Sequence, residues 1–137
     1  MHLPERVDLY EVGPREGFQS ETNPIATEDK ITFVNELSKA GLKHIEVTSF
    51  VSPKWVPQMA DAEAVLAGID RLPGITYRAA YLNLQGLERA LNNPVTLDGS
   101  LVLSASDTFS KRNMNKSTRD MFDKLPEWIE AYKAANI

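Results

Sequence analysis

The alternation of strand-like and helix-like segments along the 137 residues is the feature that most limits the possible folds. β-branched or alternating runs bounded by turn residues predict strands, and apolar residues at helical spacing predict helices. Four strands are predicted at residues 7–12, 44–50, 75–82 and 100–105, and four helices at residues 27–40, 59–69, 84–91 and 118–135. Each parallel strand needs a crossover to return beside its neighbour. The pattern therefore predicts one α/β domain, residues 1–137, with a parallel sheet.

Several helix boundaries can be predicted from individual residues. Thr27 is the expected N-cap of the first helix, and Gly41 is expected just after its end. Asn83 is the expected cap of the third helix. Pro126 lacks the N–H that an uninterrupted helix would use, so the last helix is expected to bend or restart there.

Two architectures fit four strand–helix units: an open α/β sheet, and half of a (β/α)8 barrel, which needs about 250 residues. Spacing alone does not separate them. Polar residues follow the strands at Arg15, 46–49 and 104–106, and catalytic groups of both architectures gather at this edge. The residues after the first strand match neither of the glycine-rich phosphate-binding loops, which disfavours a nucleotide-binding open sheet.

Composition excludes several classes of function. A net charge of −4 argues against a nucleic-acid-binding face. The chain has no cysteine, and so no disulfide framework, thiolate metal site or cysteine nucleophile. No apolar run approaches the roughly 20 residues of a membrane span. A cytoplasmic protein without membrane or nucleic-acid partners is the expectation.

The segment 11–19, Glu-Val-Gly-Pro-Arg-Glu-Gly-Phe-Gln, places three charged side chains around a Gly-Pro turn directly after the first strand. Such a concentration of charged side chains at a strand end indicates a ligand-binding site. Together with the long segment 45–61, it closely resembles the 3-hydroxy-3-methylglutaryl-CoA lyase family of metal-dependent TIM-barrel lyases. The similarity continues more weakly through 82–86 and 104–113 to 134–137. It covers nearly the whole chain, but only the first half of the family's barrel.

The resemblance implies a carbon–carbon lyase that cleaves a branched 3-hydroxyacyl-CoA, by a retro-Claisen reaction, to acetyl-CoA and a keto acid. It implies a divalent cation, Mg²⁺ or Mn²⁺, that chelates the substrate oxygens. An acyl-CoA thioester is the implied partner.

The same resemblance implies the site residues. Arg15 matches the catalytic arginine, and Glu11 and Glu46 match acidic residues at the ends of the first two strands. Glu16 stands where the family carries a metal-binding aspartate, so its longer side chain is expected to change metal geometry or substrate choice. Gln19 and Ser49 are the expected substrate contacts. Trp55 and Met59 are placed where an acyl-CoA entrance would be, but such residues beside a helix more often pack in the core.

In the family, a pair of metal-binding histidines spaced His-x-His and a catalytic cysteine lie beyond the equivalent of Ile137. This chain has neither feature. An alternative hypothesis is therefore a catalytically inactive half-barrel that binds an acyl-CoA or a partner chain. Because a half-barrel leaves unpaired strand edges, self-association or a separate second half is expected.

Overall fold

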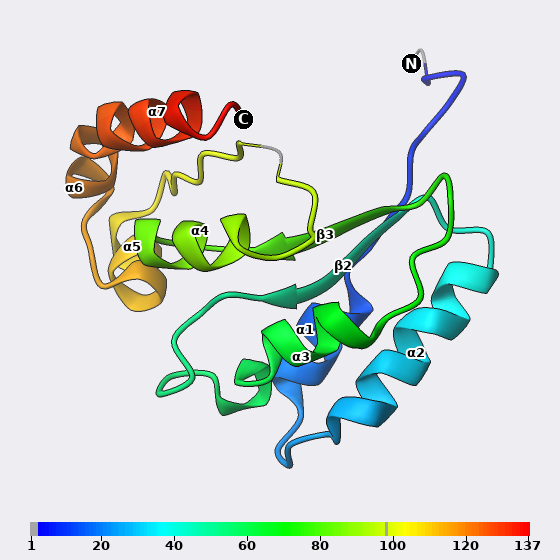
Figure 1. Cartoon of the computed structure of the whole chain (residues 1–137). Coiled ribbons are helices and arrows are strands. Elements are labelled where there is room, and N and C mark those ends of the chain that lie inside the picture. The colour runs from blue at the N-terminus through cyan, green and yellow to red at the C-terminus, as the bar shows by residue number, and fades with distance from the viewer. Residues whose placement is uncertain (1–2, 98) are drawn as a thin grey trace.

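A three-stranded parallel sheet organises the molecule, which is a computed structural model describing residues 3–97 and 99–137. The strands lie in the order β1 (Tyr10–Glu11), β2 (His44–Ser49) and β3 (Thr76–Ala80). Tyr10 pairs with His44, and the β2–β3 register shifts between Glu46 and Thr48. Figure 1 shows the helices grouped around this sheet. The α/β class with parallel strands is confirmed.

Helices connect and cover the strands. They are α1 (Gly13–Ser20), α2 (Thr27–Lys39), the short 3₁₀ helix η1 (Pro57–Met59), α3 (Ala62–Gly68), α4 (Leu84–Leu91), α5 (Asp107–Met114), α6 (Thr118–Asp123) and α7 (Leu125–Ala134). Both α2 and α3 pack against β2. None of the helices in the described part of the chain is long and apolar enough to cross a membrane.

The hydrophobic core lies between the sheet and the helices. Alternate residues of β2 and β3, Ile45, Val47, Tyr77 and Ala79, are at most 7% exposed. They belong to one cluster with apolar residues from α2 and α3 (Val34, Val65 and Leu66) and from α4 (Ala90). The intervening residues carry polar groups: the rings of Tyr10 and His44 stack 4.4 Å apart, and the Arg78 guanidinium lies 4.8 Å from the Tyr10 ring centroid. The period-2 pattern thus separates an apolar face from a polar one.

Most predicted helix boundaries are confirmed. Gly41 follows the C-terminal end of α2 with φ +85°, a conformation that favours glycine. The Asn83 side chain accepts a hydrogen bond from the Gly86 N–H and caps α4. Thr27 is not a cap, and that prediction is wrong. Its neighbour Ala26, whose side chain has no hydrogen-bonding group, occupies the N-cap position. Thr27 is the first residue of α2, and its hydroxyl donates to Asp61.

The predicted fourth strand, residues 100–105, does not form in the described part of the chain. Pairing beyond β3 begins with a parallel bridge between Arg78 and Thr96 but does not continue as a strand. The side chains of Leu101 and Val102 instead line an apolar pocket with Trp128 of α7. An apolar run need not form a strand, and here Leu101 and Val102 lie beside α7 and stay 43% and 53% exposed. The first strand is also shorter than predicted, and Leu9 before it is 70% exposed.

Two helices lie where none was predicted. The first, α1, begins directly at Gly13, with Pro14 in its first turn, where a missing N–H costs no helical hydrogen bond. The second, α5, is capped by Ser106. The last predicted helix restarts before Pro126, as expected, and forms α6 and α7.

At the start of α6, hydrogen bonds from Ser117 lower the pKa of the Asp120 carboxyl.

Candidate functional site

The turn from β1 into α1 positions the first group of the site. The Gly13 N–H donates to Glu11 Oε1 at 2.5 Å, so this carboxylate satisfies one of the free N–H groups at the helix start. A Cβ at Gly13 would lie 2.7 Å from the same oxygen, so a larger residue here would displace the Glu11 carboxylate. The structure therefore places Glu11 against the backbone at the beginning of α1.

Arg15 lies in the first turn of this helix, between two carboxylates. Its Nε donates to Glu46 Oε1 at 2.5 Å, and its Nη1 donates to Glu16 Oε1. The Arg15 and Glu46 side chains are 21% and 24% exposed, whereas that of Glu16 is 55% exposed. Glu46 is the third residue of β2 and Arg15 comes from α1, so the ion pair forms where β1 ends beside the middle of β2. Glu46 therefore lies within its strand and not at the carboxyl end that the sequence predicted.

The guanidinium keeps donors for a ligand. An arginine carries five N–H groups, and the contacts with Glu46 and Glu16 use one on Nε and one on Nη1. No other partner of Arg15 is found among residues 3–97 and 99–137. A positively charged group that two carboxylates orient, and that still has free N–H groups, can stabilise negative charge developing on a bound oxygen.

The two predicted substrate contacts lie in different environments. Gln19 is half-buried on α1, one turn after Arg15, so both side chains share a face of the helix. Ser49 is the last residue of β2 and is 1% exposed. Gln19 therefore lies on the same helix face as Arg15, and Ser49 lies beneath the surface at the end of β2.

A second cluster, which the sequence did not predict, fixes α1 from its far end. The Gln58 side chain donates to the Glu21 carbonyl at 2.7 Å, at the C-terminal cap of α1. Lys30, 4% exposed, donates to the Gln58 carbonyl at 2.6 Å and to Asp61 Oδ1 at 2.7 Å. The only sequence signal is that Lys30 lies four residues before Val34, on the apolar side of α2.

The predicted metal ligand does not form a complete metal site with its neighbours. Within the part of the chain that the structure describes, no group of three His, Asp or Glu side chains is arranged to hold a metal ion. Glu16 pairs with Arg15, and Glu11 accepts from Gly13. The carboxylate oxygens suit Mg²⁺ or Mn²⁺ chemically, but these residues alone do not fit a bound cation.

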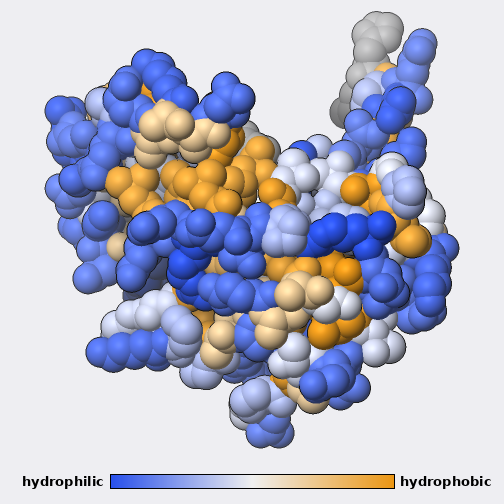
Figure 2. Space-filling model, in the orientation of Figure 1, coloured by the Kyte–Doolittle hydropathy of each residue, from blue (hydrophilic) through white to orange (hydrophobic). Residues whose placement is uncertain are grey.

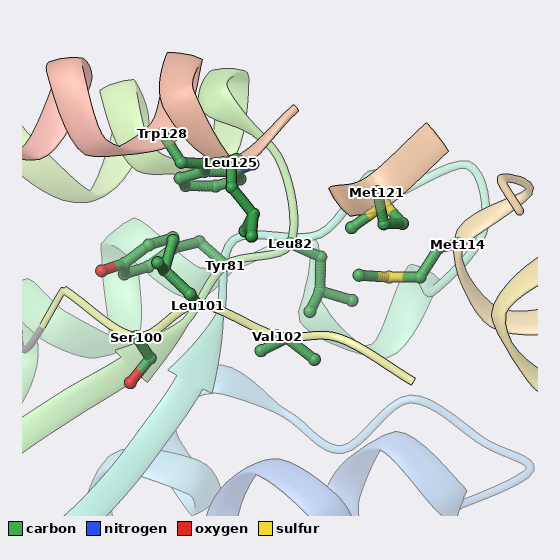
Figure 3. A pocket seen from close by; sticks show the side chains of 9 residues that line it. All are labelled: Tyr81, Leu82, Ser100, Leu101, Val102, Met114, Met121, Leu125 and Trp128. Atoms are coloured by element: carbon green, nitrogen blue, oxygen red, sulfur yellow. The ribbon is translucent and has the colours of Figure 1, made fainter. Parts of the chain in front are cut away.

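Two pockets in the described structure lie away from Arg15. One has a volume of about 20 Å³ and an apolar lining, Tyr81, Leu82, Ser100, Leu101, Val102, Met114, Met121, Leu125 and Trp128 (Figure 3). Such a volume admits about one water molecule. The other, about 230 Å³, is lined by residues 6–9 and 41–44, at the amino ends of β1 and β2. Neither forms an acyl-CoA site at the strand ends.

Comparison with known proteins agrees with this geometry. The family model described as HMGL-like matches residues 6–137. The 3-hydroxy-3-isohexenylglutaryl-CoA/hydroxy-methylglutaryl-CoA lyase of Pseudomonas aeruginosa is 50% identical over 131 residues, covering 96% of this chain and 43% of that protein.

Solved structures give the same result for the fold. The HMG-CoA lyase of Bacillus subtilis matches with a TM-score of 0.87 and 45% identity, covering all of this chain and 46% of that one. An HMG-CoA lyase from Acinetobacter baumannii, in complex with coenzyme A and 3-methylmalate, matches with a TM-score of 0.80 and 38% identity over 93% of this chain and 41% of that one. The chain thus spans less than half the length of these relatives, and its three strands form part of a barrel. This protein belongs to the HMGL-like family.

Proposed function

We propose that this chain is the N-terminal half of a hydroxymethylglutaryl-CoA lyase-type enzyme, a carbon–carbon lyase acting on a branched 3-hydroxyacyl-CoA. The observation that carries the proposal is Arg15, which follows β1 and is held between Glu16 and the β2 residue Glu46 in a chain of this family.

The reaction has defined chemical requirements. A base removes the proton of the tertiary 3-hydroxyl, the neighbouring C–C bond breaks, and its electron pair passes to the acetyl thioester as an enolate. Protonation of that enolate gives acetyl-CoA, and the hydroxyl carbon becomes the carbonyl of the keto acid. A fixed guanidinium opposite the enolate oxygen lowers the barrier because it is oriented before charge develops.

In this proposal the three catalytic side chains have separate tasks. Arg15 donates its remaining N–H groups to the developing enolate oxygen. Glu46 orients it through the 2.5 Å bond to Nε, and Glu11 fixes the start of α1, from which Arg15 projects. Gln19, one helical turn away, and the buried Ser49 are the proposed contacts for the acyl group.

Glu16 is the proposed metal ligand of this half. A divalent cation would supply Lewis-acid activation of the hydroxyl. Glu16 offers carboxylate oxygens, and its side chain is 55% exposed, more than those of Arg15 and Glu46. The described residues do not offer enough ligands to complete a site for Mg²⁺ or Mn²⁺.

The substrate class is an acyl-CoA thioester. Two relatives support this: the Pseudomonas aeruginosa enzyme is named for a hydroxymethylglutaryl and an isohexenylglutaryl thioester, and the Acinetobacter baumannii structure contains coenzyme A. We also propose that residues 1–137 form a single domain in a cytoplasmic protein. The chain would associate with a second barrel half or with another copy of itself.

Acetyl-CoA release tests the proposal. The complete protein carrying this chain should release acetyl-CoA from 3-hydroxy-3-methylglutaryl-CoA or a longer branched analogue, and more with Mn²⁺ than with a chelator. Failure to cleave every branched 3-hydroxyacyl-CoA offered would overturn it.

The second candidate is a half-barrel that binds acyl-CoA without turnover. The incomplete ligand set around Glu16 favours it. Saturable acyl-CoA binding with no acetyl-CoA release would select this alternative.

A further inference from the structure

Arg78 of β3 is a charged residue that the proposed reaction does not use, and it lies on the same face of the sheet as Glu46. The residues on either side of Glu46 in β2, and on either side of Arg78 in β3, belong to the hydrophobic core. Successive side chains of a strand point to opposite faces. Glu46 and Arg78 therefore share the face opposite the core, where Arg15 meets Glu46.

Sheet pairing places these two residues side by side. Figure 1 shows β2 next to β3, and Glu46 is the register partner of Arg78. The register shifts only after this pair, between Glu46 and Thr48. Neighbouring strands lie about 4.8 Å apart, so the two side chains leave adjacent backbone positions. Opposite charges on such cross-strand neighbours attract one another.

The Arg78 side chain extends over β2. Its guanidinium carbon lies 4.8 Å from the centroid of the Tyr10 ring, although β2 separates β3 from β1, the strand that carries Tyr10. The Tyr10 ring in turn stacks on His44, which is two residues before Glu46 on the same face of β2. The aromatic contact thus holds the guanidinium above β2, beside Glu46.

Glu46 is therefore flanked by cations from two elements. Arg15 of α1 donates its Nε to Glu46 Oε1 at 2.5 Å, and Arg78 approaches from β3. A carboxylate has two oxygens and can accept hydrogen bonds at both. A second cation beside the glutamate limits the orientations that its flexible side chain can adopt. The carboxylate that orients Arg15 is thus itself restrained.

We propose that Arg78 is a positioning residue of the lyase site: it restrains the Glu46 carboxylate from the β3 side, so that Glu46 holds Arg15 in one orientation. This inference rests on the proposed function, because it extends the support of the guanidinium that meets the substrate. The effect of Arg78 on the reaction passes through Glu46.

The Arg15 Nε–H tests this restraint in the 137-residue chain without turnover. Nuclear magnetic resonance detects this N–H, and the loss of its signal in Arg15→Lys assigns it. Arg78→Met should speed its exchange with water by about threefold or more, because a less restrained Glu46 releases it more often. Arg71→Met is the matched control, since Arg71 lies 5.8 Å from the ring of the core residue Tyr77, and it should leave the exchange unchanged.

Kinetics of the complete protein test the consequence. Arg78→Met should lower kcat for acetyl-CoA release by about fivefold and change KM by less than about twofold, because substrate contacts remain. Arg78→Lys keeps a cation and should stay within about twofold of the unmodified kcat. In a Glu46→Gln background, Arg78→Met should add less than about twofold, because the two residues act together. Circular dichroism verifies folding, and Arg78→Gln replaces Arg78→Met if the apolar side chain prevents it.

Three results overturn the proposal: unchanged Arg15 Nε–H exchange in Arg78→Met, an Arg78→Lys variant as slow as Arg78→Met, or the full loss of kcat when Glu46 is already glutamine. The last result would mean that Arg78 acts independently of Glu46. Faster exchange in Arg78→Met, in a chain whose complete protein has no lyase activity, would retain the positioning of Glu46 and overturn only the proposed reaction.

Discussion

At the residue scale, the two contacts of Arg15 determine what a replacement can do. Lysine offers one ammonium group, so it cannot hold Glu46 and Glu16 and also present a fixed fork to the substrate. We expect Arg15→Lys to remove about 3 kcal/mol or more of transition-state stabilisation, measured as kcat in the complete protein. Arg6→Lys, at a side chain 73% exposed, is the control. A loss of turnover below about tenfold would mean that Arg15 is structural.

The carboxylate at position 16 is tested by shortening it. Glu16→Asp moves the carboxylate by about one bond length, so the Mn²⁺ concentration for half-maximal acetyl-CoA release should shift by about threefold or more if this side chain is a ligand. Glu21→Asp, at the exposed C-cap of α1, is the matched control. An unchanged metal dependence would show that Glu16 does not bind the cation.

The buried Lys30 gives a stability prediction. Lys30→Met leaves Asp61 Oδ1 and the Gln58 carbonyl without the Lys30 donor, which we expect to lower the free energy of unfolding by about 3 kcal/mol. Urea unfolding measures this loss. Lys39→Met, on the same helix with a side chain 61% exposed, should change stability by less than about 0.5 kcal/mol. Equal effects of the two substitutions would contradict a special role for the Lys30 cluster.

At the element scale, the approach of α4 to the end of β2 depends on Gly86. An added Cβ would lie 2.7 Å from the Phe50 carbonyl oxygen, which belongs to the backbone and cannot move aside freely. We therefore expect Gly86→Ala to destabilise the fold by about 1–3 kcal/mol, despite the better helix propensity of alanine.

Gly17 in α1 is the matched control for this contact. A Cβ there meets nothing within 4 Å, so Gly17→Ala should stabilise by about 0.5–1 kcal/mol. Thermal unfolding of both variants measures the difference. A stabilising Gly86→Ala would show that α4 can shift without cost.

The elements predicted correctly are those with local signals. Helix periodicity defined α2, and Asn83 marked the start of α4. The prediction failed where one local signal had two structural meanings. Gly13-Pro14 marks either a turn or a helix start, and two residues of the run 100–105, Leu101 and Val102, line a pocket with Trp128 of α7 instead of pairing in the sheet.

The proximity of Arg15 to Glu46 could be predicted from the sequence because the carboxyl ends of parallel strands meet at one edge. The sequence could not predict the hydrogen bonds from Lys30 to Gln58 and from Gln58 to Glu21, because these bonds depend on the conformation of the loop after β2.

At the scale of the whole molecule, an uncovered apolar surface accompanies the open sheet edge. Figure 2 shows apolar atoms gathered between α7 and α4. Leu101, Val102 and Leu103 are 43%, 53% and 44% exposed. Among the residues that the structure describes, β3 pairs beyond β2 only through the bridge from Arg78 to Thr96. Exposed apolar residues beside an open strand edge favour association with another chain.

We therefore expect the 137-residue chain to associate in solution, with an average mass above 15.3 kDa that rises with concentration. Leu103→Lys places a charge in this apolar segment without altering the pocket lining, so it should weaken association by about tenfold or more. Asn113→Lys adds the same charge at an exposed site on α5 and is the control. Sedimentation velocity measures the association of the unmodified chain and of both variants. A single 15.3 kDa species at all concentrations would show that the chain is a stable monomer despite its unpaired strand edge.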